Sequence, residues 1–139
     1  MQWNRRNDVA QTENCWVGVK PDGTSVGYLQ GFQDGSAAYW YELQQQGLPA
    51  RDMEEAKNRL LSRFCPLRVV CVEANGTEHV SRDDVKTPSA YTEADGFLRH
   101  VVDGLRQKSG VAPFGGVDRR IERVRLLAND GTILDEQAI

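Results

Sequence analysis

One segment, residues 49–66 (PARDMEEAKNRLLSRFCP), constrains the fold more than any other part of this chain. Asp52 is a suitable helix N-cap, Glu55 follows three residues later as in a capping box, and Pro66 cannot continue a helix. Apolar residues within the segment recur at the spacing of one helix face: Met53, Ala56, Leu60, Leu61 and Phe64. The segment therefore predicts an amphipathic helix. We expect its apolar stripe to be buried against strands that precede and follow it in the sequence.

The residues before this helix have the pattern of short strands. Turn sequences, Pro21-Asp22-Gly23 and Asp34-Gly35, separate apolar and aromatic runs of strand length. The predicted strands cover residues 15–20, 26–32 and 37–43, with residues 44–48 as the link to the helix. These segments predict a three-stranded antiparallel meander.

A hairpin is predicted directly after the helix. Residues 67–74 are valine-rich and are followed by Asn75-Gly76, a strong hairpin signal. We expect residues 77–81 to return antiparallel to this strand and residues 83–90 to form a polar loop.

A second helix is predicted between Thr92, a suitable N-cap, and Gly110, which would lie just past its end. Gly96 and Gly104 lower the helix propensity, so we expect them to permit close approach to a sheet. The apolar stripe of this helix is Phe97, Leu98, Val101, Val102 and Leu105.

The C-terminal segment predicts a loop and another hairpin. Residues 111–117 are rich in glycine and proline and are expected to form a loop centred on Phe114. Strands at residues 121–128 and 132–136 would be joined by Asn129-Asp130-Gly131, with Arg125 facing Glu136 across the pair.

The resulting order, βββ-α-ββ-α-ββ, predicts an α+β protein with a mostly antiparallel sheet and two helices packed on one face. We expect one domain, residues 1–139, with two sub-units: the meander plus helix (1–66) and the hairpin-helix-hairpin segment (67–139). A chain of this length buries roughly two-thirds of its unfolded surface, so it needs no disulfide or metal for stability.

Composition narrows the class of protein. The net charge of −3 and the pI of about 5.4 argue against a general nucleic-acid binder. No apolar run approaches ~18 residues and the first residues are polar, so neither a membrane span nor a signal peptide is expected. Three cysteines without paired spacing favour reduced thiols and a cytoplasmic location.

Two patterns suggest nucleophilic catalysis. Residues 23–27 match G-x-S-x-G, but a turn precedes Ser25 and a strand follows it, whereas a nucleophile elbow joins a strand to a helix. Cys71 and His79 lie on one predicted hairpin. A two-residue turn at Asn75-Gly76 would pair Cys71 with Val80 and place thiol and imidazole on opposite faces. Neither pattern predicts an active site.

Metal and phosphate sites are not predicted either. Cys65 and Cys71 are too far apart in sequence for a zinc knuckle, and Asp83-Asp84 lacks the spacing of a calcium loop. The glycine-rich segment 110–116 lacks the Lys-Ser/Thr of a phosphate-binding loop. We therefore expect no metal and no cofactor.

Aromatic residues crowd the predicted meander. Because adjacent residues of a strand point to opposite faces, Tyr39 and Trp40 cannot both face one core. At least one large ring should lie on the solvent side, unless both faces of the sheet are covered, and exposed tryptophan and tyrosine commonly anchor interfaces. The predicted partner-binding residues are Trp16, Tyr39, Trp40, Tyr41 and Phe114.

A second candidate surface is basic. Arginines cluster just after the glycine-rich loop, and alternation would place Arg123 and Arg125 on one face. The cluster could bind a phosphate backbone or an acidic partner, or form a solvated strand face neutralised by Asp118, Glu122 and Glu136. Its members are Arg119, Arg120, Arg123 and Arg125.

A set of residues in the first sixty positions carries a resemblance to a known group of proteins: Trp3, Asp8, Trp16, Gly27-Tyr28, Tyr39-Trp40 and Glu55-Ala56-Lys57. With these residues, the opening sixty positions resemble small accessory proteins encoded by phages and prophages. The resemblance covers under half of the chain and implies an interaction protein directed at a host or defence component, with no catalytic residue to carry over.

The favoured function is therefore a small non-enzymatic protein that binds or inhibits a protein partner. The alternative is a nucleic-acid or nucleotide-binding accessory protein that uses the Arg119 to Arg125 strand. A hydrolase built around Ser25 is the third and least favoured alternative. An edge strand that pairs with a second copy of the chain stays open, because edge strands are templates for pairing.

Overall fold

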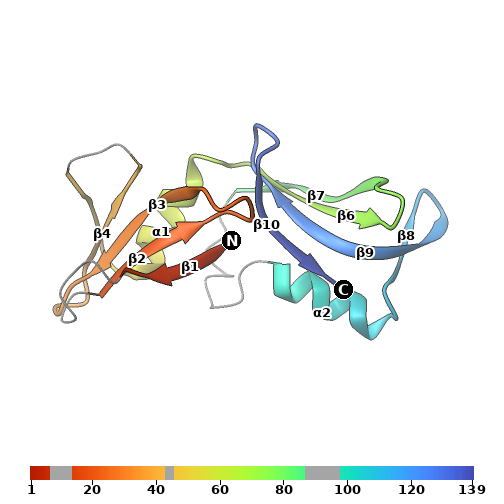
Figure 1. The fold of residues 1–139 in the computed structure, drawn as a ribbon, viewed down its shortest axis with the longest axis horizontal. Helices are drawn as coiled ribbons and strands as arrows, with labels where there is room; N and C mark the ends of the chain where they lie inside the picture. The colour runs from red at the N-terminus through yellow and green to blue at the C-terminus, as the bar shows by residue number, and fades with distance from the viewer. Residues whose placement is uncertain (7–13, 43–45, 87–97) are drawn as a thin grey trace.

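The computed structural model describes residues 1–6, 14–42, 46–86 and 98–139. It is an α+β fold with antiparallel strand pairs, as the sequence predicted, and its strands form two sheets that each carry one helix (Figure 1). The N-terminal sheet is ordered β1-β2-β3-β4-β5, and the C-terminal sheet β10-β9-β6-β7, with β8 paired to β9. The two sheets, with α1 and α2, form two lobes side by side along the long axis.

Both predicted helices and the predicted strands are present, together with three further short strands, β1, β5 and β8. The N-terminal lobe consists of β1 (Gln2–Arg5), β2 (Asn14–Val19), β3 (Ser25–Gly31), β4 (Ala37–Trp40), β5 (Leu48–Ala50) and α1 (Met53–Ser62). The C-terminal lobe consists of β6 (Leu67–Glu73), β7 (Glu78–Val85), α2 (Leu98–Gln107), β8 (Val111–Phe114), β9 (Val117–Leu127) and β10 (Ile133–Ala138).

Helix α1 is the element that the sequence predicted best. Asp52 caps it by accepting a hydrogen bond from the Glu55 backbone N–H at 2.8 Å. Ala56 and Leu60 are fully buried and pack with Leu29 and Tyr39 of the N-terminal sheet. Met53, Ala56 and Leu60 of the predicted stripe therefore cover one face of that sheet, whereas Phe64 lies beyond the end of α1 and packs on the C-terminal core.

The sequence predicted three strands before α1, and the N-terminal sheet has two more, the short edge strands β1 and β5. Strand β1 is polar apart from Trp3, whose ring lies over Gly18, where a Cβ would come within 2.8 Å of it. Strand β5 has only three residues and contains Pro49, which is tolerated at a sheet edge. Both lack the length and alternation that predict a strand.

In the C-terminal lobe, two predicted loops are strands. Residues 83–85, expected in a loop, belong to β7. The predicted loop at residues 111–117 is instead a tight hairpin in which β8 pairs with β9 from Phe114↔Val117 to Val111↔Arg120. Gly115 and Gly116 at its tip have φ of 61° and 76°, which suits a two-residue hairpin turn. The glycines that suggested a loop thus form the turn of a hairpin.

Helix α2 packs Leu98, Val102 and Leu105 on the C-terminal sheet. Gly104 is exposed, and a Cβ at this position would meet nothing within 4 Å, so the predicted close approach is wrong. The expected cap at Thr92 and the expected roles of Gly96 and Phe97 fall on residues outside the described ranges.

The lobes share a joint at the end of α1. Val26 of β3 is buried in the core of the C-terminal lobe, and Arg63 donates a hydrogen bond to its carbonyl oxygen at 2.6 Å. Across the joint, the Asn129 backbone N–H donates to the Phe64 carbonyl at 2.8 Å. The Met1 ammonium forms an ion pair with Asp135, which is only 8% exposed. These contacts fix the lobes against each other.

The packing of α1 on β3 leads to a prediction about Gly27. This residue has φ of 146°, and a Cβ there would lie against the Trp40 carbonyl oxygen and 2.7 Å from Leu60 Cδ1. We expect Gly27→Ala to lower the free energy of unfolding by at least about 2 kcal/mol, because overpacking and backbone strain add. Urea denaturation followed by circular dichroism measures the change.

Gly104→Ala is the matched control, since its Cβ meets nothing. It should raise the free energy of unfolding by about 0.5–1 kcal/mol through helix propensity. Equal effects of the two substitutions would contradict the described contact between α1 and β3.

Candidate functional site

The face of the N-terminal sheet opposite α1 presents large apolar side chains. Tyr28 of β3 pairs directly with Trp40 of β4, and Val17 of β2 pairs with Tyr28, so all three share one face. Leu29 and Tyr39, their neighbours in sequence, lie on the opposite face under α1. We call Val17, Tyr28 and Trp40 the aromatic face.

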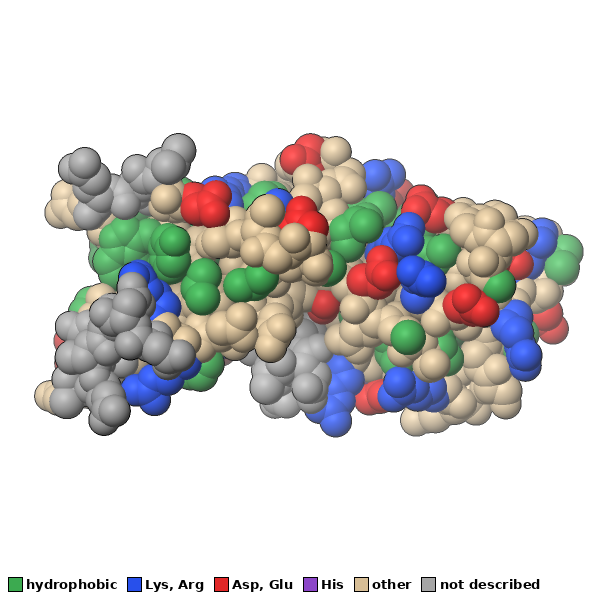
Figure 2. Space-filling view, in the orientation of Figure 1, with side chains coloured by type: hydrophobic (Ala, Val, Ile, Leu, Met, Phe, Trp, Pro, Cys, Tyr) green, Lys and Arg blue, Asp and Glu red, His purple; other side chains and the backbone are tan. Residues whose placement is uncertain are grey.

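The aromatic face is partly exposed. Its three residues are half-buried, and none belongs to the buried clusters that α1 and α2 form with the sheets. No helix or strand among the described residues packs over it. Figure 2 shows hydrophobic side chains gathered over the strands of the N-terminal lobe on the side turned to the viewer, with α1 behind them. Such a surface is typical of an interaction site.

The two rings of the aromatic face are held in place by contacts with neighbouring residues. The Arg6 guanidinium lies 4.9 Å from the centre of the Tyr28 ring. The Trp40 ring lies against the backbone of Gly47, where a Cβ would come within 2.5 Å of Trp40 Cζ2. Preorganised rings lose little conformational entropy when a partner binds.

The structure separates the aromatic residues that the sequence grouped. Trp40 lies on the aromatic face, whereas Tyr39 is 6% exposed and belongs to the core under α1. Trp16 and Tyr41 pack against that same core. Phe114 lies in the other lobe, stacked on His79 with ring centres 4.8 Å apart.

Tyr28 was not among the predicted binding residues. The signal that could have found it is the Asp34-Gly35 turn, which sets the register in which Tyr28 pairs with Trp40. The prediction that Tyr39 and Trp40 point to opposite faces is confirmed.

Tyr41 illustrates the packing on the helix side. The Arg63 guanidinium lies 4.8 Å from the centre of its ring. Burial, followed by the charge of Tyr39, raises the pKa of the Tyr41 hydroxyl, while Arg63 opposes this shift. Its ring therefore packs on the core under α1 and contacts Arg63, which donates to Val26 at the joint between the lobes.

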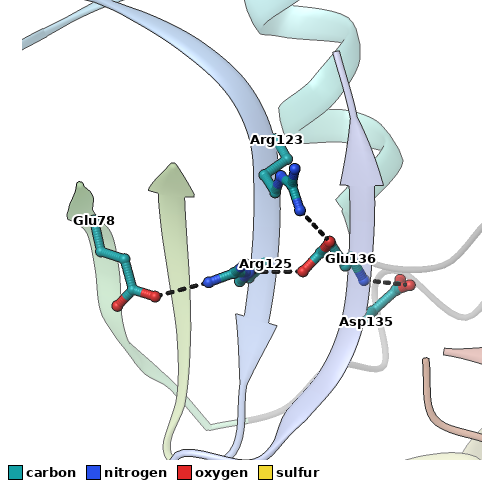
Figure 3. Close-up of polar contacts among 5 residues, drawn as sticks. All are labelled: Glu78, Arg123, Arg125, Asp135 and Glu136. Carbon is teal, nitrogen blue, oxygen red and sulfur yellow. Dashed lines mark hydrogen bonds and ion pairs between the residues drawn. The ribbon is translucent and has the colours of Figure 1, made fainter. Parts of the chain in front are cut away.

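The predicted arginine strand is divided by its ion pairs. Arg125 Nε donates to Glu136 at 2.6 Å and its Nη1 to Glu78 at 2.8 Å, while Arg123 Nη1 donates to Glu136 at 3.1 Å (Figure 3). The hydrogen bond with Glu136, and more weakly Glu78, raises the pKa of Arg125. The predicted Arg125–Glu136 contact is confirmed, and these two arginines are neutralised within the protein.

This ion-pair network lies on an apolar strip. Val70 pairs with Arg125 and Val72 with Arg123, so arginines and valines share the face of the C-terminal sheet opposite α2. Val70 and Val72 are each 2% exposed and cluster with Leu127. The aliphatic stems of the arginines can cover such a strip while their charged ends meet carboxylates.

Arg119 and Arg120 differ from the other two arginines. They lie on the β8–β9 hairpin, and neither guanidinium group has an ion pair or hydrogen bond with a described residue. The Nε of Arg119 is buried without a hydrogen-bond partner there. The basic cluster therefore consists of one neutralised pair and one pair for which the described residues provide no acceptor.

The β6–β7 hairpin corrects the predicted register around Cys71. The loop has three residues with Gly76 at φ of 86°, so Cys71 pairs with His79 and not with Val80. His79 Nε2 lies 2.7 Å from Glu73 Oε2. Cysteine, histidine and glutamate therefore share one face, as the nucleophilic arrangement would require.

The arrangement nonetheless lacks an activated thiol. Cys71 is 2% exposed, and no hydrogen bond joins it to His79 in the described structure. Burial raises the pKa of the Cys71 thiol, whereas a nucleophilic cysteine needs a lowered one. Cys71 is a core residue.

Ser25 begins β3 and does not lie on a nucleophile elbow. Its Oγ accepts a hydrogen bond from the Gly27 backbone N–H at 3.1 Å, and a strand follows it. Within the described ranges, no three His, Cys, Asp or Glu side chains are grouped so that they could hold a metal ion. None of the helices described is long and apolar enough to cross a membrane.

In comparisons with known proteins, no family model, curated protein or solved structure matches this chain. Inference about its function therefore depends on the residues themselves.

The ion-pair network leads to a prediction about Arg125, whose side chain is 22% exposed. We expect Arg125→Ala to lower the free energy of unfolding by about 1–3 kcal/mol, because Glu78 loses its ion pair with Arg125, Glu136 keeps only Arg123, and Val70 loses cover. Arg120→Ala, which removes no ion pair, should change stability by less than about 0.5 kcal/mol. Urea denaturation compares them, and equal losses would contradict the structural role of Arg125.

Burial of Cys71 leads to a prediction about reactivity. Burial raises the pKa of the Cys71 thiol, so less of it is present as the reactive thiolate at neutral pH than in an exposed cysteine. We expect iodoacetamide at neutral pH to label Cys71 far more slowly than half-buried Cys65 in the native protein, as mapped by mass spectrometry. Labelling of Cys71 faster than Cys65 would instead indicate an activated thiol.

Proposed function

We propose that this chain is a non-enzymatic protein-binding module that docks a partner protein on its aromatic face. The observation that carries the proposal is the directly paired Tyr28 and Trp40 on a sheet face over which no described element packs. Tryptophan and tyrosine are the residues most enriched at the energetic centres of interfaces.

The chemistry of the rings supports a protein partner. Each ring has a large apolar surface and a polar group at its tip. Such side chains suit a surface that is exposed to water in the free protein and buried in a complex. Val17 extends the apolar area across β2, and Arg6 adds a charged group beside Tyr28. A hydrophobic centre with a polar rim is the usual anatomy of a protein interface.

The charge of the protein disfavours nucleic acid as the main ligand. The chain is acidic, with a net charge of −3, and Arg123 and Arg125 are neutralised by Glu136 and Glu78. Binding to a phosphate backbone requires cations that can replace its counterions. The buried thiol of Cys71 and the backbone-bonded hydroxyl of Ser25 likewise lend no support to an enzyme.

The resemblance of the first sixty residues to phage and prophage accessory proteins suggests the kind of partner. We infer that the target is a host or defence component, that binding inhibits it, and that the encounter takes place in the cytoplasm. The partner's identity is left to the experiment below.

The test is capture of a partner by the immobilised protein, followed by affinity measurement with the purified partner. We expect Trp40→Ala to weaken binding by at least about tenfold, because a ring at the centre of an interface contributes most of its energy. Its cost in free energy of unfolding should be only about 1 kcal/mol, since the ring is partly exposed. Isothermal titration calorimetry and urea denaturation measure the two effects.

Two control substitutions separate binding from folding. Val80→Ala alters a residue that is 51% exposed in the other lobe and should leave binding unchanged. Trp16→Ala, which opens the core under α1, should lower the free energy of unfolding by about 3 kcal/mol. Unchanged affinity in Trp40→Ala, or capture that nuclease treatment abolishes, would overturn the proposal.

A further inference from the structure

The β8–β9 hairpin, residues 111–120, extends the C-terminal sheet at the end of the molecule far from the N-terminal lobe (Figure 1). Strand β8 pairs with β9 alone, and the two glycines at the tip give a short, defined turn. We call this element the projecting hairpin. Its backbone is preorganised by four residue pairs.

The projecting hairpin is attached to the body of the lobe through Phe114. Its ring is stacked on His79 of β7 with an interplanar angle of 13°, and His79 contacts Glu73 of β6 at 2.7 Å. The ring therefore serves to hold the hairpin in place, and other residues of the hairpin are left for contact with a partner.

Two cations on the projecting hairpin have no acceptor within the described part of the chain. Arg119 pairs with Ala112 and Arg120 with Val111, so their side chains leave opposite faces of the hairpin. The buried Nε of Arg119 has no hydrogen-bond partner, which is costly for a charged group. Arg123 and Arg125, a few residues further along β9, have carboxylate partners.

An exposed apolar residue accompanies these cations. Val117 is 52% exposed and, two residues before Arg119, shares its face of β9. It is one of three large hydrophobic residues exposed to this degree among the described residues. The hairpin thus places an apolar side chain beside a guanidinium that has no acceptor in the part of the chain that the structure describes.

We propose that an acidic segment of a partner protein binds around the edge of the projecting hairpin, with one carboxylate on Arg119 and an apolar side chain on Val117 on one face, and a second carboxylate on Arg120 on the other face. Charge complementarity supports this occupant, because guanidinium groups bind carboxylates in paired hydrogen bonds. The surface lies in the opposite lobe from the aromatic face, so the proposal stands independently of the function proposed above.

A short acidic segment fits this surface better than nucleic acid. Asp118 lies between the two arginines in sequence, and Glu122 follows them. Glu122 and Glu136 also line the groove of about 630 Å³ beside Arg120. A continuous polyanion would be repelled by these carboxylates, whereas a peptide can place one or two carboxylates on the guanidinium groups alone.

The probe for this proposal is a fluorescein-labelled, glutamate-rich peptide that carries a leucine, followed by fluorescence anisotropy. We expect binding that weakens with salt and is reduced at least about tenfold in the double variant Arg119→Gln and Arg120→Gln. Val117→Ser should weaken binding about threefold through lost apolar contact. Circular dichroism checks the fold, and Arg120→Gln alone, an exposed change, tests the proposal if the double variant is unstable.

The control has the same change in net charge elsewhere on the surface. Arg51→Gln with Lys86→Gln, at two exposed positions, should leave peptide binding within about twofold of the wild type. Absence of peptide binding, equal losses in the control and test variants, or tighter binding of a labelled oligothymidine than of the peptide would each overturn the proposal.

Discussion

The placement of Val26 is the constraint on which the arrangement of both lobes depends. This residue belongs to β3 of the N-terminal sheet, yet its side chain is buried in the core of the C-terminal lobe. Arg63, at the end of α1, donates to the Val26 carbonyl and lies over the rings of Tyr41 and Phe64. One strand and one helix end therefore fix the two lobes, so the aromatic face and the projecting hairpin are held at opposite ends of the molecule.

Each sheet has one face covered by a helix, and the two remaining faces are treated differently. On the C-terminal sheet, an ion-pair network of Arg123, Arg125 and Glu136 lies over buried Val70 and Val72. On the N-terminal sheet, Tyr28 and Trp40 stay half-buried; Arg6 lies over the Tyr28 ring, and no described helix or strand packs over the two rings. Charged groups that already form ion pairs with each other have little capacity left to bind a ligand. Two adjacent, partly exposed aromatic rings can still be buried by a binding partner. This contrast directs the functional inference to the aromatic face.

The candidate site could be predicted only in part from the sequence. Alternation correctly placed Tyr39 and Trp40 on opposite faces, but it could not say which face α1 covers, because that depends on the packing of Leu60 against Leu29. The hairpin at Asn75-Gly76 was predicted, and its register was not. A loop one residue longer than expected moved His79 onto the face of Cys71, since a shift by one residue exchanges the faces of a strand.

The sequence by itself determined the α+β class, helix α1 with its Asp52 cap, and the positions of the main turns, because capping, periodicity and turn chemistry act over a few neighbouring residues. Only the tertiary structure decided that the strands form two sheets, that Arg125 is neutralised by Glu78 and Glu136, and that Arg119 has no described acceptor. These features depend on contacts between residues distant in sequence. Local sequence patterns do not encode such contacts, because the contribution of a side chain to stability depends on which distant residues the fold places beside it.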